Sequence, residues 1–399
     1  MPKHVKDLNV AGKKVFIRTD YNVPLDEGKV ADDFRIVSSL PTIEYLLEQG
    51  ASLILASHLG RPKGQRVPEM SLKPVADRLA ELVNAKVHFA PDCVGEAVAT
   101  MAEDLPAGEI LVLENLRFHA AETDNDAAFS RKLAALADVY VNDAFGTAHR
   151  AHASNVGMTR FFDQKAAGFL LMKEIDFLVN AIENPARPFT VVMGGSKVSG
   201  KIDLLKRLAD VADNILIGGG MAFTFLSANP LNNDVGASLV EEDRLEFAAD
   251  VIKLCVDKGV NLVLPSDCTA SREIKEDAEV VELPIRGLED DLMGLDIGRR
   301  TVKTFNSVLD DSKTVLWNGP MGVFEMTPFQ NGTRAVAEKL VEITKSGAVT
   351  IVGGGDSAAA LKKFGLDKGV THTSTGGGAS LELLSGYDLP AFEALKGAK

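Results

Sequence analysis

Short apolar runs alternate with longer amphipathic segments along the whole chain, and this alternation limits the possible folds more than any other feature. The apolar runs are rich in Val, Ile and Leu and contain few polar residues, which is typical of strands buried on both faces of a parallel sheet. The longer segments place apolar residues at helical spacing. The pattern therefore predicts an α/β protein in which helices cover both faces of parallel sheets.

The predicted strands and helices occupy much of the sequence. The strands are residues 15–18, 52–56, 86–89, 110–113, 139–141, 189–193, 215–217, 262–264, 315–317 and 349–352. The clearest helices between them are residues 33–49, 73–83, 129–137, 242–258 and 334–345. No internal repeat is present, so a solenoid or a propeller is not expected.

The length of the chain predicts two domains. Its 399 residues, with a mass of 42.6 kDa, exceed what one hydrophobic core usually organises. The best boundary is the segment 184–188, where two prolines end a helical run and a new strand follows. The last segment, residues 381–399, is too short for a unit of its own and is expected to pack on another part of the chain.

Charge and cysteine content argue against several classes of function. The formal net charge of −13 argues against a general nucleic-acid or membrane-surface binder. Cys93, Cys255 and Cys268 are isolated, so neither a disulfide framework nor a zinc cluster is expected, and a reducing compartment is favoured. No signal peptide and no apolar run of membrane-spanning length is present. A cytoplasmic location is therefore predicted.

Basic residues gather after the strands of the first half, where ligands of open parallel sheets bind. The segments that follow these strands are residues 18–22, 57–61, 114–119 and 142–150. Arg35, Arg61, Arg117 and Arg150 are expected to converge at one sheet edge. Arginine binds phosphate or carboxylate through two parallel hydrogen bonds. This half is therefore predicted to bind a small, highly anionic substrate.

Glycine follows most of the strands of the second half. The segments after these strands are residues 194–195, 218–220, 265–267, 318–320 and 353–356. Glycine lets the backbone approach a flat ring or a polyphosphate closely. Asp356, which follows the last glycine turn, is a suitable ligand for a hard cation. This half is therefore predicted to bind a nucleotide together with Mg²⁺.

The glycine turn at residues 194–201 leaves alternatives open. Lys197 and Lys201 would lie in the first turn of a helix, where they suit a phosphate, although a solvated basic turn has the same pattern. The turn matches most of a P-loop, but Ile202 stands where Ser or Thr should hold Mg²⁺. Residues 353–358 match a dinucleotide motif without the required downstream acid. A P-loop NTPase and a dehydrogenase are the weaker alternatives.

Nine segments together carry a family resemblance. They are residues 20–24, 57–62, 113–119, 144–152, 194–201, 217–223, 317–325, 353–357 and 374–380. They include the sequences DYNVP, SHLGRP, LENLRFH and WNGPMGVFE. In these segments, over essentially its whole length, the chain resembles phosphoglycerate kinase.

The resemblance implies a reaction and an architecture. The family transfers a phosphoryl group reversibly between 1,3-bisphosphoglycerate and Mg-ADP, giving 3-phosphoglycerate and ATP. The resemblance implies two Rossmann-like domains with parallel sheets that close across a cleft, and a monomer. Residues 1–172 with 383–399 would bind the phosphoglycerate, 173–187 would form a connecting helix and hinge, and 188–382 would bind the Mg-nucleotide. Another Mg-nucleotide-dependent kinase and a non-catalytic binding protein on this scaffold are the alternatives.

The resemblance also assigns residues by position. The phosphoglycerate would be bound by Asp20, Tyr21, Asn22, Arg35, His58, Leu59, Gly60, Arg61, Arg117 and Arg150. Arg35 and Lys197 would act on the transferring phosphoryl group. The nucleotide would be bound by Lys201, Gly219, Asn318, Pro320, Val323, Glu325, Gly353, Gly354, Gly355, Asp356 and Ser357. Asp356 would hold Mg²⁺, and the backbone N–H groups of Gly376, Gly377 and Gly378 would face the transferred group.

The implied mechanism needs no general base, because the attacking carboxylate or ADP is already ionised at neutral pH. His58, His149 and His152 are therefore expected to form hydrogen bonds or to pack rather than to move protons. Thr19 and Tyr21 stand where the family commonly has Val and Phe, and a hydroxyl is expected near the substrate. Ser196 and Gly200 are further departures, and none of the four removes a charge that the mechanism needs.

Overall fold

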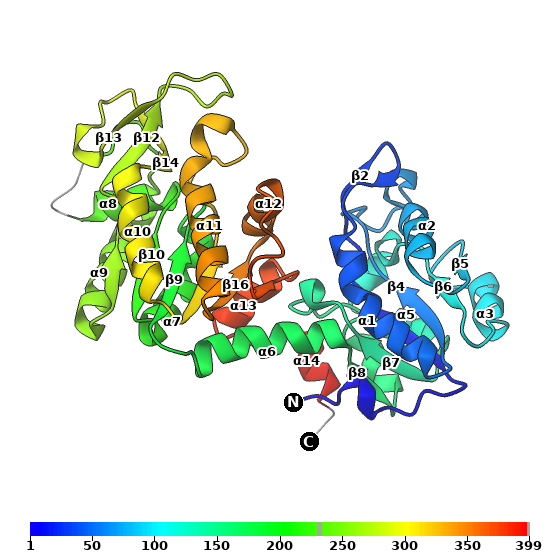
Figure 1. The fold of residues 1–399 in the computed structure, drawn as a ribbon. Helices are drawn as coiled ribbons and strands as arrows, with labels where there is room; N and C mark the ends of the chain where they lie inside the picture. Colours follow the sequence, from blue (N-terminus) through cyan, green and yellow to red (C-terminus); the bar gives the residue numbers. More distant parts are fainter. Residues whose placement is uncertain (230–233, 397–399) are drawn as a thin grey trace. The chain divides into compact units, whose positions relative to one another are not determined.

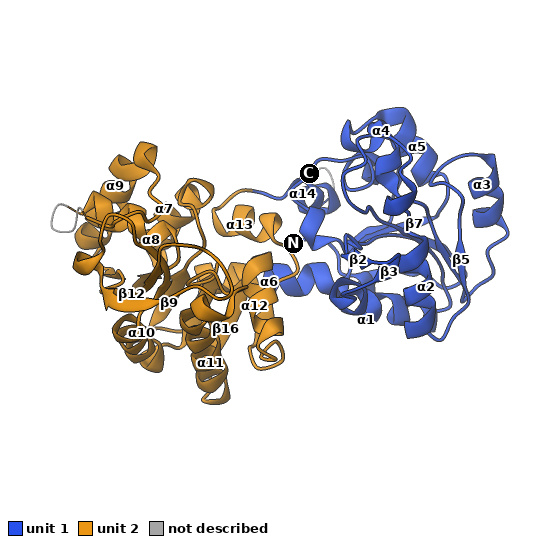
Figure 2. Cartoon of the chain, turned by 90° about the horizontal axis from the view of Figure 1, so that it is seen from above, with its two compact units in different colours: residues 1–176, 388–399 blue, residues 177–387 orange. Residues whose placement is uncertain are grey.

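The computed structural model describes residues 1–229 and 234–396. The chain forms two compact units (Figure 2). Unit 1 comprises Met1–Asp176 and Asp388–Lys399, and unit 2 comprises Phe177–Tyr387. The division falls within helix α6 (Phe169–Glu183). Each unit has its own parallel sheet (Figure 1). Each also has its own hydrophobic core.

The described part of unit 1 contains a sheet of six parallel strands in the order β5-β6-β4-β1-β7-β8. These strands are β1 (Lys14–Arg18), β4 (Ser52–Ala56), β5 (Val87–Phe89), β6 (Ile110–Val112), β7 (Val139–Asn142) and β8 (Lys165–Ala167). The central β4 is buried at every position, as its apolar sequence predicts. Strand β8 was not predicted, because Lys-Ala-Ala has little preference for a strand.

Helices pack around this sheet (Figure 1). They are α1 (Phe34–Glu48), α2 (Lys73–Leu82), α3 (Glu96–Glu103), α4 (Ala120–Thr123), α5 (Ala127–Ala134) and α14 (Pro390–Leu395). Helix α1 buries Ile36, Ile43 and Leu46 in the core, and each such side chain contributes roughly 1.5–3 kcal/mol. The chain end also belongs to this unit, since Ala391 N–H in α14 donates to Ala148 O at 3.0 Å.

The described part of unit 2 contains a second sheet of six parallel strands, in the order β11-β10-β9-β15-β16-β17. These strands are β9 (Phe189–Met193), β10 (Asn214–Ile217), β11 (Asn261–Val263), β15 (Thr314–Asn318), β16 (Val349–Gly353) and β17 (His372–Thr373). The chain runs outwards from β9 to β11 and then returns to the other side of β9 with β15. In such sheets ligands bind where the strand order reverses, at the carboxyl ends of the strands.

Apart from the end of α6, the described helices of unit 2 come between or after its strands in the sequence. They are α7 (Ile202–Val211), α8 (Met221–Ala228), α9 (Leu245–Lys258), α10 (Arg299–Asp311), α11 (Asn331–Lys345), α12 (Gly355–Lys363) and α13 (Gly378–Leu384). The prediction that Lys197 and Lys201 share the first turn of a helix was wrong. A 3-10 turn, η6 (Ser199–Lys201), intervenes, and α7 begins only at Ile202. Across the described residues, no helix combines the length and the apolar content that crossing a membrane requires.

Unit 2 also contains an antiparallel sheet that the sequence did not predict, with the order β13-β12-β14. Its strands are β12 (Asp267–Ser271), β13 (Val281–Pro284) and β14 (Met293–Ile297). Polar residues interrupt the apolar runs of β12 and β13, so they lack the pattern of a buried strand. A short hairpin in unit 1, β2 (Leu25–Asp26) with β3 (Lys29–Val30), was missed because each strand has two residues.

Candidate functional site

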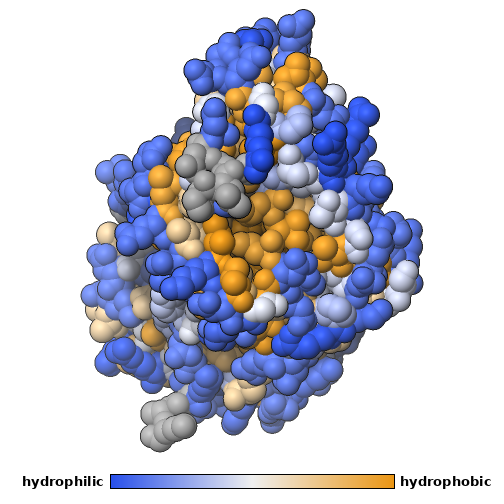
Figure 3. Space-filling model, turned by 90° about the vertical axis from the view of Figure 1, so that its left-hand side faces the viewer, coloured by the Kyte–Doolittle hydropathy of each residue, from blue (hydrophilic) through white to orange (hydrophobic). Residues whose placement is uncertain are grey.

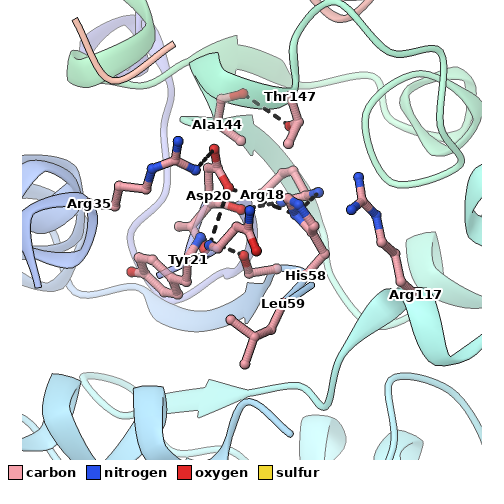
Figure 4. Close-up of polar contacts among 12 residues, drawn as sticks. Arg18, Asp20, Tyr21, Arg35, His58, Leu59, Arg117, Ala144 and Thr147 are labelled. Atoms are coloured by element: carbon pink, nitrogen blue, oxygen red, sulfur yellow. Dashed lines mark hydrogen bonds and ion pairs between the residues drawn. The ribbon is translucent and has the colours of Figure 1, made fainter. Parts of the chain in front are cut away.

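The carboxyl ends of β1 and β4 bring together a cluster of charged side chains in unit 1 (Figure 4). Arg35, in the first turn of α1, places Nη1 2.6 Å from Asp20 Oδ2. His58 Nδ1 lies 3.8 Å from Asp20 Oδ1 and 3.4 Å from Arg18 Nη2. Asp20 therefore contacts two other predicted substrate residues, Arg35 and His58.

Arg117 and Asn22 join this cluster through the loop after β4. Arg117 Nη1 donates to Gly60 O at 2.9 Å, and Gly60 N–H donates to Asn22 Oδ1 at 2.8 Å. Burial, reinforced by neighbouring arginines, lowers the pKa of Arg117 to about 10. Its Nε is buried and has no partner within the described residues, which suits a side chain that binds an anion.

Burial and neighbouring positive charges disfavour the charged form of the histidines in this cluster. Burial lowers the pKa of His58 well below its ordinary value, and the charges of nearby arginines lower it further. These arginines are Arg18, Arg117, Arg150 and Arg35. Burial and the same kind of repulsion lower the pKa of His152 to about 4 and also lower that of His149. Neutral histidines can form hydrogen bonds but carry no charge toward a substrate.

The other two predicted arginines differ in their surroundings. Arg150, after β7, is partly buried, its Nε donates to His149 Nε2 at 3.1 Å, and its charge acts on His58 and Arg117. Arg61 follows Gly60 and is exposed, and its charge is not among those that shift the pKa of His58. The structure therefore brings Arg150, but not Arg61, to the cluster.

Two predicted substrate residues have side chains in the core instead. Tyr21 is fully buried, and its hydroxyl lies 2.8 Å from Ser39 Oγ. Leu59 is also part of the buried core. The expectation that Thr19 and Tyr21 place a hydroxyl near the substrate was wrong, because both side chains point into the protein: Thr19 is likewise fully buried.

A buried network beneath the cluster was missed by the sequence reasoning. Arg18 is fully buried, and its Nε donates to Ser154 Oγ at 2.8 Å. Ser154 Oγ in turn donates to Glu122 Oε1 at 2.5 Å. The network links the end of β1 to α4 and gives the buried guanidinium a nearby negative charge. No local signal marks this network, because Arg18, Glu122 and Ser154 are far apart in the sequence.

In unit 2, Lys201 lies at the point where the strand order reverses. Its Nζ donates to Gly194 O, after β9, and to Asn318 O, at the end of β15, the latter at 3.2 Å. Burial lowers the pKa of Lys201 to about 8, and the charge of Asp356 opposes this shift. The ammonium group is thus held by two neutral carbonyls, and an anionic ligand would stabilise its charged form.

The strand ends around Lys201 are fixed by further hydrogen bonds. Asn318 Nδ2 donates to Gly353 O at 3.0 Å, which joins the ends of β15 and β16. Ser357, in α12, is fully buried and accepts the N–H of Gly319 at 2.7 Å. Its hydroxyl oxygen thus holds the turn after β15, at a residue that the sequence predicts to bind the nucleotide.

Close backbone packing surrounds the predicted nucleotide residues Gly219 and Pro320. A Cβ on Gly219 would lie 2.6 Å from Gly195 N and 2.7 Å from Pro320 O, and the residue has φ +65°. A hollow beside Gly219 is lined partly by Phe223, Leu295 and Met321. Apolar side chains also gather in a hollow on the face of the molecule that Figure 3 shows. The absence of a side chain at Gly219 therefore lets the turns after β9, β10 and β15 pack against one another.

The remaining predicted adenosine residues lie in the loop after β15. Val323 N–H donates to Leu295 O at 2.9 Å, which fixes the loop against β14. Glu325 is exposed, and its backbone O accepts from Lys363 Nζ at 2.7 Å. The loop is therefore held at both ends, with the carboxylate of Glu325 directed to solvent.

The two lysines of the glycine turn have different surroundings. Lys197 is exposed, unlike the more buried Lys201. Glu241 accepts the backbone N–H groups of Val198 and Ser199, the second at 3.2 Å. The glycine turn predicts backbone N–H groups that suit a phosphate, but a carboxylate of the protein already accepts two of them.

The glycine segment before α13 has fewer available backbone N–H groups than the sequence predicts. Gly376 is buried, and its N–H donates to Ser374 Oγ at 3.1 Å. Gly377 has φ +50° and Gly378 begins α13. The N–H of Gly376 is therefore engaged within the protein, while Gly377 and Gly378 lie at the helix start.

Asp356 has the position and chemistry of a Mg²⁺ ligand. It is an exposed carboxylate in the first turn of α12, at the carboxyl end of β16, and its charge acts on Lys201. Mg²⁺ in nucleotide sites is usually held by one or two carboxylates together with substrate phosphates and water. The residues present therefore fit this ion.

A cluster of arginines in one α/β unit and a glycine-rich strand edge with a lysine and a carboxylate in the other are typical of a phosphotransferase, which positions phosphate groups with cations and backbone. The profile of the family described as phosphoglycerate kinase matches residues 5–387. The chain is 54% identical to a cytosolic phosphoglycerate kinase of Triticum aestivum over 390 residues, which cover 98% of the chain and 96% of that protein. It is 53% identical to a chloroplastic phosphoglycerate kinase of Arabidopsis thaliana, with 98% of the chain and 82% of that protein covered.

A solved structure agrees with these matches. The phosphoglycerate kinase of Coxiella burnetii superposes with a TM-score of 0.88 and 39% identity, covering 99% of each chain. The chain therefore belongs to the phosphoglycerate kinase family, and it is a phosphotransferase with a carboxyl group as acceptor. This membership selects the kinase over the P-loop NTPase and the dehydrogenase that the glycine motifs left open.

Proposed function

We propose that unit 1 binds 3-phosphoglycerate or 1,3-bisphosphoglycerate and that unit 2 binds the nucleotide with Mg²⁺. The observation that carries this division is the mutual repulsion within the arginine cluster of unit 1. After burial, the charges of Arg150 and Arg18 lower the pKa of Arg117, and burial followed by nearby arginines lowers the pKa of His58 well below its ordinary value. A polyanion would relieve this repulsion, and a bisphosphorylated three-carbon acid carries charge at both of its ends.

Unit 2 offers a different set of groups, which supports a nucleotide there. Lys201 is one cation held between carbonyl groups, and Gly219 lines a small hollow together with the apolar side chains of Phe223 and Met321. Lys201 would contact nucleotide phosphate, and Asp356 would hold Mg²⁺. When bound, Mg²⁺ neutralises charge on the nucleotide phosphates.

The chain's own residues position the reactants and neutralise charge. Since the attacking group is already ionised, no side chain must accept a proton, and the neutral histidines of unit 1 fit this requirement. Arg35 and Lys197 would stabilise the charge on the oxygens of the transferring phosphoryl group. They belong to different units, so transfer requires that the units close on their substrates and exclude water. The proposed hinge is the helix that spans the division, residues 173–187 in the sequence-based assignment.

The oligomeric state, location and partners of the enzyme form the last part of the proposal. We expect a monomer in the cytoplasm that acts on its small substrates without nucleic acid or a membrane as a partner. The net charge of −13 supports the last point. Size-exclusion chromatography with light scattering tests the monomer.

A coupled assay with 3-phosphoglycerate and Mg-ATP tests the assignment of the metal site. In Asp356→Asn the Mg²⁺ concentration for half-maximal activity should rise, because a ligand charge is lost, while the KM for 3-phosphoglycerate should not change. Asp311→Asn, at the end of α10, is the matched exposed control. An unchanged Mg²⁺ requirement in folded Asp356→Asn would remove Asp356 from the metal site.

A further inference from the structure

One group of side chains outside both proposed sites has the composition of a metal site. Among the residues that the structure describes, Asp92, Cys93 and His119 place a carboxylate oxygen, a thiol sulfur and an imidazole nitrogen within 4.8 Å of one another. All three belong to unit 1. Asp92 and Cys93 follow β5, and His119 follows the 3-10 turn η3 (Leu116–Phe118) after β6.

The two loops that carry these residues are held together by the sheet. Strands β5 and β6 pair with Phe89 opposite Val112, and Ala90 N–H continues the pairing to Val112 O at 2.9 Å. Glu114 N–H then donates to Asp92 O at 3.3 Å. The spacing of the side chains is therefore set by neighbouring strand ends rather than by free loops.

The three side chains are arranged so that a cation can enter from solvent. His119 Nε2 lies 2.7 Å from Asp92 Oδ1, and these side chains are 32% and 35% exposed. Cys93 is buried behind them. Zinc bonds to sulfur, nitrogen and oxygen are about 2.0–2.3 Å long, so the atoms that bind one ion lie roughly 3.3–3.8 Å apart. The widest separation would have to contract by at most about 1.5 Å, and His119 Nε2 and Asp92 Oδ1 would have to move apart by about 0.6 Å or more.

The surrounding charges also permit a cation. Arg66 lies nearby, with Nη1 3.9 Å from Asp92 Oδ2 and Nη2 3.8 Å from Glu114 Oε2. The Arg66 guanidinium faces Asp92 Oδ2, whereas His119 contacts the other oxygen, Oδ1. The Arg66 side chain is 58% exposed, and the carboxylates of Asp92 and Glu114 offset its charge. Burial, with added repulsion from Asp92 and Glu122, raises the pKa of Cys93 well above its ordinary value. The thiol is therefore protonated until a cation displaces its proton.

We propose that Asp92, Cys93 and His119 bind a thiophilic divalent cation such as Zn²⁺. On binding, the S–H bond of Cys93 breaks, its proton goes to solvent, and the thiolate forms the bond to the metal. The mixed sulfur, nitrogen and oxygen ligands favour Zn²⁺ and disfavour Mg²⁺, which prefers oxygen. The site is independent of the proposed nucleotide site, whose candidate metal ligand Asp356 lies in unit 2.

The cysteine spacing could not predict this site. Cys93 lacks a second cysteine, and 26 positions separate it from His119, so the sequence analysis expected no zinc cluster. Only the pairing of β5 with β6 brings the three residues together. A bound cation would tie the loop after β5 to the loop that carries Arg117, two residues before His119.

Cobalt provides a direct test on the full-length protein with Mg²⁺ in excess. Co²⁺ should produce a near-ultraviolet absorption band from a metal–thiolate bond, and Zn²⁺ should abolish it. Cys93→Ala should eliminate the band. His119→Gln should weaken Co²⁺ affinity by more than the ~10- to 100-fold that is lost when a side chain hydrogen-bonded to a metal ligand is removed.

Two variants are matched controls. Cys255→Ala removes a buried cysteine outside the cluster, and His88→Gln removes a histidine that pairs with Glu109 without a thiol. Both should leave the band and the affinity unchanged. Circular dichroism establishes folding, and if Cys93→Ala does not fold, His119→Gln decides, since its side chain is partly exposed. Absence of the band in the unmodified protein, or affinity unchanged in folded His119→Gln, would overturn the proposal.

Discussion

Arg35 Nη1 lies 2.6 Å from Asp20 Oδ2, so a carboxylate at the end of β1 holds the arginine that is predicted to reach the transferring phosphoryl group. The Asp20 side chain is 8% exposed and that of Arg35 is 29% exposed. The carboxylate is thus fixed in the protein, while the guanidinium is accessible to a ligand. A bidentate donor held in this way can stabilise transition-state charge without reorganising during the reaction.

Substitution of Arg35 should therefore lower the rate of phosphoryl transfer and leave the protein folded. In Arg35→Ala we expect kcat to fall about 10²- to 10³-fold, the effect of losing one donor at developing charge. Arg35→Lys retains the charge without the planar fork and should lose less. Stopped-flow measurements of single turnovers, with circular dichroism as the folding check, separate these variants. Equal rates in folded Arg35→Ala and in the unmodified enzyme would remove Arg35 from the catalytic groups.

Arg117 provides the test of which unit binds the phosphoglycerate. In Arg117→Ala the loss of a hydrogen bond to a charged group, about 1.5–3 kcal/mol, should weaken 3-phosphoglycerate binding roughly 10- to 100-fold. The affinity for ADP should stay the same. Isothermal titration calorimetry measures both, and Arg299→Ala, which removes a side chain that is 91% exposed, is the control. A loss confined to ADP would reverse the proposed division.

The sequence predicted the sheets and the charges of the site better than the positions of its hydroxyl groups. Buried parallel strands such as β4 have a continuous apolar pattern, so they were located correctly. Tyr21 and Ser357 stand in motifs that look ligand-binding, but their hydroxyls contact Ser39 and the N–H of Gly319. These contacts depend on side-chain direction and on residues distant in the chain. Local sequence determines neither the direction of a side chain nor the distant residues that it meets.

Lys201 should make nucleotide binding pH-dependent. Burial lowers its pKa to about 8 in the free protein, so the charged form is lost as pH rises through that value. We expect Mg-ADP affinity to decline between pH 7 and 9, because a neutral amine attracts phosphate less. Lys201→Arg should bind with little change over this range, since arginine stays charged. A pH-independent affinity in the unmodified protein, measured by calorimetry, would exclude Lys201 as the phosphate contact.

Asp143 should lower the free energy of unfolding at neutral pH, where its buried carboxyl group is ionised. It is fully buried after β7; its Oδ1 accepts Leu171 N–H at 3.0 Å, and its Oδ2 has no partner among the described residues. Burial raises its pKa from 3.8 to about 6. Between these values the folded state binds the proton more tightly, so the free energy of unfolding falls as pH rises. The total contribution is about 3 kcal/mol, an order-of-magnitude figure from about two pKa units.

Asp143→Asn should remove this dependence. The amide oxygen can still accept from Leu171, and no charge is buried above pH 6. Urea unfolding at pH 5 and pH 8 should show a smaller pH difference in Asp143→Asn than in the unmodified protein, with Asp257→Asn as the exposed control. An unchanged difference would show that another group accounts for the pH dependence.

Gly219 tests the close packing of the nucleotide site, and Gly259 is its matched control. Both have similar left-handed φ values, +65° and +71°, so an alanine at either position costs about 1–2 kcal/mol in backbone strain. A Cβ at Gly259, which ends α9, meets nothing within 4 Å, whereas one at Gly219 lies 2.6 Å from Gly195 N. Gly219→Ala should therefore destabilise the protein more and raise the KM for ADP, while Gly259→Ala should change stability alone. If both variants have the KM of the unmodified enzyme, the approach of Gly219 to Gly195 does not shape the nucleotide site.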